Sequence, residues 1–185
     1  MTPRSTLSRW LLAAVPTIAA LAAVPAQAEQ FEPFGEIRGY PSGVIFTGGL
    51  GLPLSNNYYG SLHAGYNVAE RGNNGEFDDE SGGGFGFGGT VDRYFGPNQT
   101  GWFAGGRLEL FFLEIDYRGP GSGTSDITVF QPTVRGGYAW RFGNSGQYGV
   151  QLAVSAGAEI NVATSGPEVG EGAIVLGGVS FTFKP

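Results

Sequence analysis

The sequence of 185 residues has no cysteine, and it has a single lysine, Lys184, and a single histidine, His63. The absence of cysteine excludes disulfide bonds and a thiolate nucleophile. Charged residues make up 14 % of the chain, against roughly 25 % in an average soluble domain. Soluble β-proteins usually carry lysine on edge strands and on faces that meet water. The shortage of charge, and of lysine above all, therefore needs a physical explanation.

Residues 29–185 also lack a long apolar run, because no segment there has 18 consecutive apolar residues. We therefore expect no transmembrane helix in this part of the chain. The N-terminal segment differs, since Arg4 and Arg9 precede an apolar run at 10–24 that is followed by Ala26-Gln27-Ala28. Basic residues, a short apolar run and an A-x-A site are typical of a secretory signal peptide. The sequence thus predicts a signal peptide over 1–28, cleaved after Ala28, and one exported domain over 29–185.

The charge balance is acidic. The formal net charge is −6, and removal of Arg4 and Arg9 with the signal peptide would make it −8. A nucleic-acid partner needs a basic surface, so we expect none.

Segments that alternate apolar and polar residues recur along the rest of the chain, separated by clusters of Gly, Asn, Pro and Asp. Such alternation predicts β-strands. We expect eight of them, near residues 34–40, 43–52, 58–69, 84–95, 101–117, 127–142, 148–162 and 173–183. Short connections alternate with longer ones at 70–83, 118–126 and 163–172. This arrangement predicts an all-β, eight-stranded antiparallel up-and-down barrel, either transmembrane in the bacterial outer membrane or soluble and of the lipocalin type.

The side of each strand that faces outward distinguishes these two barrels. In segment 127–142 one face ends in three large aromatic residues, Tyr138, Trp140 and Phe142, whereas the other face carries Arg135 and Arg141. Three such rings would crowd the mouth of a small soluble barrel, but they suit an interfacial aromatic girdle on a lipid-facing surface. The predicted girdle consists of Trp102, Tyr138, Trp140, Phe142, Tyr148 and Phe183.

The strand positions that alternate with these outward apolar residues predict a polar lumen. Its members are Glu36, Arg38, His63, Asp92, Arg107, Glu109, Arg135, Arg141 and Glu159. Four arginines and four acids balance one another, as they must in an eight-stranded barrel whose interior is just wide enough for side chains. Glycines on the same phase leave room for the long side chains. We therefore predict a plugged lumen. At Phe111-Phe112 the alternation reverses, which predicts either a β-bulge or an exit from the membrane just beyond.

The segment Gly177-Gly178-Val179-Ser180-Phe181-Thr182-Phe183 resembles the closing strand of outer-membrane barrels. Together with the signal peptide and the eight segments, it makes residues 29–185 similar to the OmpA/OmpX-like superfamily of small eight-stranded barrels. The pattern Gly101-Trp102-Phe103-Ala104-Gly105-Gly106-Arg107 with Ile115-Asp116-Tyr117 is typical of the uncharacterised outer-membrane members. The resemblance implies contact with outer-membrane lipid and lipopolysaccharide, and recognition of the last strand by the barrel assembly machinery. We expect a monomer.

Candidates for chemistry are few. Ser61 and His63 lie on one strand face, and some lipid A deacylases and acyltransferases that resemble this fold use His with Ser and an acid. The predicted register points both side chains into the lumen, which a lipid ester cannot reach. The acidic run 77–82 lacks the ligand spacing of an EF-hand, and no helix follows the glycines of 82–89 to bind a phosphate. We expect a non-enzymatic envelope component or surface interaction module without metal or cofactor; a narrow channel and a lipid A-modifying enzyme are the alternatives.

Overall fold

The computed structural model describes residues 31–71, 78–118, 121–167 and 171–184. The predicted signal peptide and its cleavage after Ala28 lie outside these residues. Within them, no helix is both long and apolar enough to cross a membrane.

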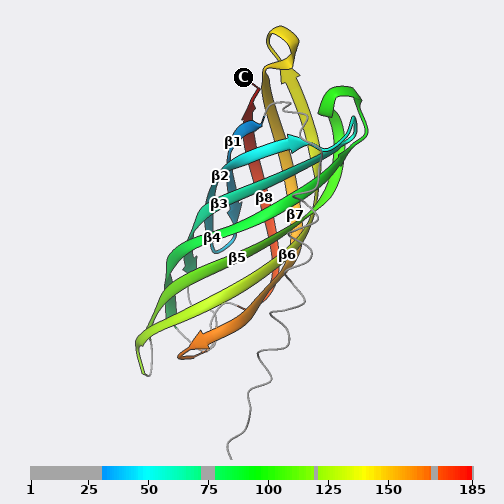
Figure 1. Ribbon diagram of the computed structural model, residues 1–185. Helices are drawn as coiled ribbons and strands as arrows, with labels where there is room; N and C mark the ends of the chain where they lie inside the picture. The colour runs from blue at the N-terminus through cyan, green and yellow to red at the C-terminus, as the bar shows by residue number, and fades with distance from the viewer. Residues whose placement is uncertain (1–30, 72–77, 119–120, 168–170, 185) are drawn as a thin grey trace, which may run out of the picture.

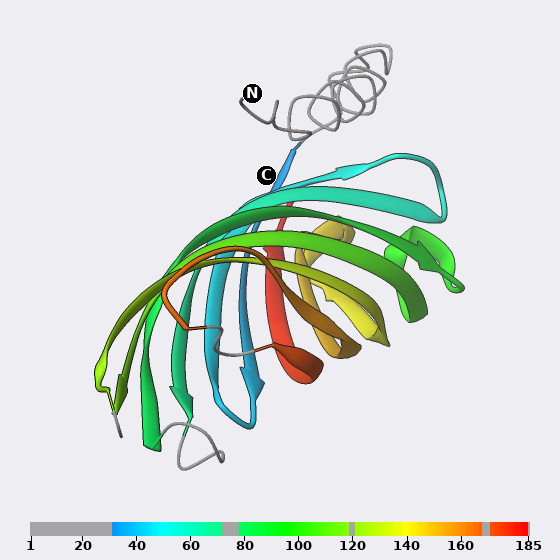
Figure 2. The same ribbon diagram turned by 90° about the horizontal axis from the view of Figure 1, so that it is seen from below.

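Eight strands follow one another around a closed antiparallel barrel, and β1 pairs with β8 (Figures 1 and 2). The predicted all-β, eight-stranded up-and-down fold is therefore confirmed. The strands are β1 (Glu32–Tyr40), β2 (Gly43–Pro53), β3 (Tyr58–Arg71), β4 (Asp78–Tyr94), β5 (Gly101–Arg118), β6 (Gly123–Phe142), β7 (Tyr148–Ser165) and β8 (Gly172–Phe183).

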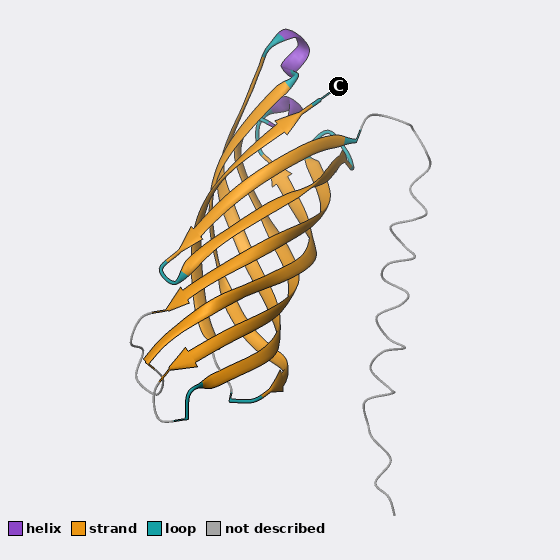
Figure 3. Cartoon of the chain, turned by 90° about the vertical axis from the view of Figure 1, so that its left-hand side faces the viewer, coloured by secondary structure: helices purple, strands orange, loops and turns teal. Residues whose placement is uncertain are grey.

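The two ends of the barrel differ. At the end where β1 begins and β8 finishes, which we call the terminus end, the connections are short. Two of them contain single 3-10 turns, η2 (Pro97–Gln99) and η3 (Asn144–Gly146), which Figure 3 shows at the same end as the C-terminus. In the second connection, Gly143 and Gly146 adopt φ of +83° and +73°, a conformation that glycine takes without steric cost. We call the opposite end the loop end.

The wall of the barrel is uneven in height. Strands β1, β2 and β8 have 9, 11 and 12 residues, whereas β4, β5, β6 and β7 have 17, 18, 20 and 18. Because β3 continues to Arg71, β4 already starts at Asp78 and β7 continues to Ser165, much of the predicted connections 70–83, 118–126 and 163–172 is strand. The reason is that polar residues on an outward strand face look like a loop in the sequence.

Of the two alternatives predicted at Phe111-Phe112, a β-bulge or an exit from the membrane, the bulge is wrong. The register of β5 against β6 is continuous from Gly101 to Tyr117, and Phe111, which is 1 % exposed, and Leu113 face inward while Glu114 faces outward. What changes at this level is the chemistry of both faces, not the direction of the side chains. The register shifts instead lie between Asp78 and Glu80 in β4 and opposite Thr128/Val129 in β7.

Candidate functional site

The outer face of the barrel is a belt of exposed apolar side chains to which every strand contributes. Val134 is 69 % exposed and Val154 is 62 % exposed. One representative of each strand, in chain order, is Ile37, Phe46, Leu62, Phe85, Leu108, Val134, Val154 and Phe181. Contiguous exposed apolar surface of this extent marks a contact with an apolar environment.

Aromatic side chains gather on the outer face near the terminus end. The structure places the six predicted girdle residues in two runs of contacting rings. Ring centroids of Tyr138 lie 5.3 Å from Trp102 and 4.7 Å from Trp140. Those of Tyr148 lie 5.9 Å from Phe142 and 5.6 Å from Phe183. The first run lies on the neighbouring strands β5 and β6, and the second lies on β6, β8 and the start of β7 between them.

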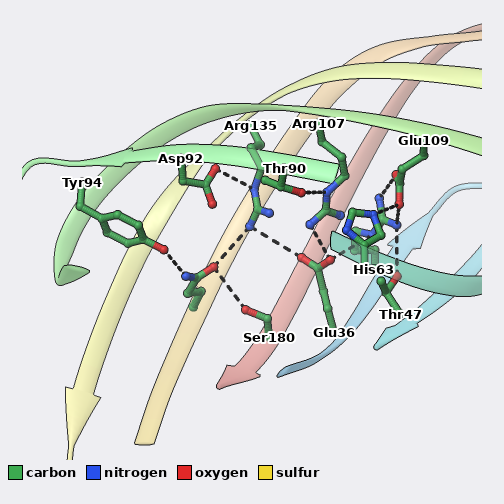
Figure 4. Close-up of polar contacts among 12 residues, drawn as sticks. Glu36, Thr47, His63, Thr90, Asp92, Tyr94, Arg107, Glu109, Arg135 and Ser180 are labelled. Atoms are coloured by element: carbon green, nitrogen blue, oxygen red, sulfur yellow. Dashed lines mark hydrogen bonds and ion pairs between the residues drawn. The ribbon is translucent and has the colours of Figure 1, made fainter. Parts of the chain in front are cut away.

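The lumen is centred on Glu36 of β1, which is 4 % exposed. One of its oxygens, Oε2, lies 2.6 Å from Arg107 Nη2 and 3.4 Å from Arg38 Nε, and the other lies 3.7 Å from Arg135 Nη2. Figure 4 shows Arg107 of β5 and Arg135 of the neighbouring β6 reaching across the lumen toward this carboxylate. A single carboxylate thus links strands that are far apart around the wall.

A second carboxylate, Glu109 of β5, holds the opposite side of the lumen. It accepts two hydrogen bonds from Arg38, at 2.6 and 2.5 Å, and its Oε1 lies 3.0 Å from His63 Nε2 (Figure 4). Asp92 Oδ1 lies 3.7 Å from Arg135 Nε. We call Glu36, Arg38, Asp92, Arg107, Glu109 and Arg135 the lumen layer. Its three guanidinium groups and three carboxylates cancel in formal charge, which is how buried ions are tolerated.

Two further ion pairs lie toward the ends of the lumen. At the terminus end, Arg141 Nη2 lies 2.5 Å from Glu32 Oε2 and donates to Gln99 Oε1 at 2.6 Å. At the loop end, Arg71 lies 2.8 Å from Glu159 and 3.7 Å from Glu80.

All nine lumen residues named from the sequence therefore point inward. Seven meet in the lumen layer and at His63, while Arg141 and Glu159 make separate contacts. The sequence did not predict Glu32, Arg71 and Glu80, because the expected strands at 34–40, 58–69 and 84–95 start later or end earlier than β1, β3 and β4. The signal was present, since Glu32 continues the phase of Glu36.

Buried apolar side chains lie on both sides of the layer. Toward the loop end, one buried cluster consists of Ile45, Ala69, Phe111, Leu113, Ile115, Ile127, Val129, Ile174 and Leu176. Toward the terminus end, a second consists of Tyr59, Tyr94, Phe103 and Ala139. Arg135 lies over the Phe103 ring at 5.2 Å, so the charged layer packs directly on this second cluster.

The spaces left in the interior are small. A cavity of about 20 Å³ borders Glu36, Asp92 and Arg107, and one of about 10 Å³ borders Arg71 and Glu159. Each has room for about one water molecule. Arg107 Nη1, a buried atom without a hydrogen-bond partner that belongs to a residue lining the first cavity, is a group that such water would satisfy.

Glycines at the inner faces of β4 and β5 make room for the polar contacts. A Cβ atom at Gly88 would lie 2.7 Å from Glu109 Cγ and 2.9 Å from His63 Nε2. A Cβ atom at Gly105 would overlap the Asp92 carboxylate. Neither position accepts a side chain unless the ion pairs move.

Ser61 and His63 do not form a catalytic triad. His63 Nε2 faces Glu109, but its Nδ1 has no hydrogen-bond partner, so the second ring nitrogen does not contact a serine. A Ser-His-acid triad requires both contacts. His63 is also buried inside the barrel, away from the face that a lipid substrate would meet.

The acidic run 77–82 gives no assembled cation site within the described residues, which contain no group of three or more potential metal ligands. Phe77 lies outside them. Asp79 is 3.8 Å from Arg118, whereas Glu80 turns inward to Arg71, so the two carboxylates diverge.

No family model matches the sequence, and no curated protein matches it. A solved structure that resembles the chain is the N-terminal β-barrel domain of OprF from Pseudomonas aeruginosa. The two are 14 % identical, the TM-score is 0.43, and the match covers 84 % of this chain and 98 % of that one. The function therefore has to be inferred from the side chains of this chain.

Proposed function

We propose that the protein is an integral β-barrel of the bacterial outer membrane. One observation carries this proposal: both faces of β5 and β6 change character at the same height. Phe111 of β5 pairs with Val129 of β6, and Leu110 pairs with Phe130. Beyond Phe112 toward the loop end, β5 turns Leu113 and Ile115 inward and Glu114 outward, and β6 turns Ile127 inward and Asp126 outward. Toward the terminus end, the charged residues Glu109, Arg107 and Arg135 face inward, and Leu108, Val134 and Trp140 face outward. A change of surrounding solvent from water to hydrocarbon explains the reversal.

The orientation follows from the strand extensions. Outer-membrane barrels have short periplasmic turns and a longer extracellular part. Here β5 and β6 extend past the apolar belt at the loop end as strands with polar outward faces, so the terminus end is periplasmic and the loop end extracellular. The outward carboxylates of Glu114, Asp116 and Asp126 then lie above the hydrocarbon. The tall wall of β4 to β7 stands out of the membrane on the extracellular side, and it is the surface most accessible to a partner.

We infer that the barrel is a non-enzymatic structural component or surface interaction module with a closed lumen. Its support is the buried, charge-balanced lumen layer between two apolar clusters, with interior cavities of about 20 and 10 Å³. A narrow channel would require the ion pairs of the lumen layer to separate and open a continuous path. A lipid A-modifying enzyme would need Ser61 and His63 on the lipid side.

The partners follow from this placement. The apolar belt contacts outer-membrane lipid, and the extracellular wall lies at the level of lipopolysaccharide. The last strand, with Phe181 and Phe183 pointing outward, is what the assembly machinery would recognise. We propose a monomer, because the barrel closes on itself and leaves β1 and β8 paired. We also propose cleavage after Ala28, because Ala26-Gln27-Ala28 has the A-x-A pattern of a signal-peptide cleavage site.

Fractionation and gel mobility test the proposal. The full chain, expressed in a Gram-negative host, is expected in the urea-washed outer-membrane fraction. Its electrophoretic mobility in a gel containing sodium dodecyl sulfate is expected to change on boiling, because a closed barrel stays compact until heat unfolds it. Recovery from the periplasm without detergent would instead show a soluble barrel.

A further inference from the structure

Arg93 of β4 is an exception on the lipid-facing wall, because it is a charged residue on the outward face near the terminus end. It pairs with Tyr58 of β3 and with Ala104 of β5 in the sheet register. Its guanidinium carbon lies 5.9 Å from the centre of the Tyr58 ring and 5.5 Å from that of Phe95. Both distances are within the range of cation–π contacts, so two rings hold the charge against the wall.

No carboxylate in the described part of the chain forms an ion pair with Arg93. Arg118, the other outward arginine of the strands, is different. It lies at the loop end, 3.8 Å from Asp79, on the side where Glu114 and Asp126 also face outward. Among the described strand residues, the two ends therefore carry outward charge of opposite sign.

A guanidinium packed on aromatic rings keeps its N–H donors free in its own plane, where they match the geometry of a phosphate. The rings of Tyr58, Phe95 and Trp102 place this group at the level of the aromatic girdle, where lipid headgroups begin. We propose that Arg93, which has no carboxylate partner among the described residues of the wall, binds the phosphodiester of an anionic phospholipid headgroup in the periplasmic leaflet, and that Tyr58 and Phe95 position it. This inference rests on the proposed membrane-spanning function.

The chain contains a natural reporter for this site. The Phe95 N–H donates to the Trp102 carbonyl at 2.9 Å, and the Trp102 side chain is 67 % exposed, so it meets the same lipids as Arg93. The other tryptophans of the chain are Trp10 and Trp140. In the full chain carrying Trp10→Phe and Trp140→Phe, fluorescence therefore comes from Trp102 alone.

The experiment reconstitutes this reporter chain in phosphatidylcholine vesicles that contain either brominated phosphatidylcholine or brominated phosphatidylglycerol at equal mole fraction. Bromine quenches tryptophan on contact. We expect phosphatidylglycerol to associate with the Arg93 site about fivefold more strongly than phosphatidylcholine does, since a basic residue near an anionic lipid surface contributes roughly 1 kcal/mol. Arg93→Gln is expected to reduce the preference to about one, whereas Arg93→Lys keeps part of it.

Arg118→Gln is the matched control, because it removes an outward arginine at the opposite end, and it should leave the preference unchanged. Replacing chloride by inorganic phosphate at constant ionic strength should also leave it unchanged. Equal quenching by both lipids, an unchanged preference in Arg93→Gln, or loss of the preference in Arg118→Gln or in phosphate would overturn the assignment. A complete lack of quenching by brominated phosphatidylcholine would overturn the membrane-spanning function itself.

Discussion

Glu109 and Glu114 lie five residues apart on β5 and meet opposite environments. Glu109 is buried against Arg38 and His63, whereas Glu114 is exposed on the outer face. A strand alternates its side chains with period two, so the sequence was sufficient to sort inward from outward residues. It could not say which arginine meets which acid. Glu36 reaches Arg107 and Arg135 across the interior, and such pairs depend on the barrel's stagger, which no local pattern encodes.

Removing one charge from the lumen layer should be costly. Glu109→Gln leaves the buried Arg38 without its main counter-charge, and breaking a buried pair in this way costs about 3–5 kcal/mol. The expected result is a lower free energy of unfolding, measured by urea titration of the reconstituted barrel with gel mobility as the signal. Glu114→Gln is the control and should stay within about 0.5 kcal/mol of the unsubstituted chain. Equal effects of the two substitutions would contradict the described lumen.

The small space in the lumen limits which substitutions the barrel tolerates, as the buried charges do. Gly88→Ala would insert a methyl group between Glu109 and His63, and overpacking of this kind costs about 1–3 kcal/mol. Gly35→Ala is the matched comparison, since nothing lies within 4 Å of a Cβ atom there. We expect Gly88→Ala to lower the urea midpoint and Gly35→Ala to leave it nearly unchanged. If both variants unfold at the same midpoint, the tight contact at Gly88 is not present in the folded barrel.

At the scale of the element, β5 contains a change of environment within one uninterrupted strand. The alternation of apolar and polar residues in the sequence reverses at Phe111-Phe112, which predicts either a bulge or an exit from the membrane. The structure has no bulge there. The strand ends were harder to predict. Beyond Phe112 the outward residues are acidic and the flanking segments rich in Gly and Ser, so the pattern resembled a loop. Hydrogen bonding between β4, β5 and β6 keeps these residues extended.

A pair of arginine substitutions on the outer face of β5 would locate the edge of the hydrocarbon. Leu108→Arg places a charge on the apolar belt, where lipid-facing arginine costs about 2–4 kcal/mol at mid-depth. Glu114→Arg lies six residues further, about 20 Å along the strand, and faces Asp126 of β6. We expect Leu108→Arg to lower the free energy of unfolding strongly and Glu114→Arg to change it little. A harmless Leu108→Arg would place that residue in water.

At the scale of the whole molecule, the closed topology came from counting strands and connections, because an even number of alternating segments leaves few other arrangements. The uneven height of the wall could not be predicted in this way. It depends on β1, β2 and β8 being shorter than β4 to β7, and those lengths are set by pairing across the barrel rather than by each segment alone.

Closure of the lumen has a direct test in planar lipid bilayers. With apolar clusters on both sides of the lumen layer and water-sized cavities beside Glu36 and Arg71, the full chain should insert without producing discrete steps of ionic current. Insertion is checked independently by protease protection of the strands. Reproducible single-channel steps from inserted protein would show that the layer parts, and would favour the narrow-channel alternative.

The charge balance of the lumen layer has one more consequence, which concerns voltage. A potential of 100 mV across a membrane does work of about 2.3 kcal/mol on each elementary charge that crosses it. The three cationic and three anionic groups of the layer are bonded to one another and sum to zero. An electric field therefore pulls the two signs in opposite directions and does no net work when the layer moves as a unit. In the proposed membrane-spanning barrel, the lumen layer therefore contributes no net gating charge.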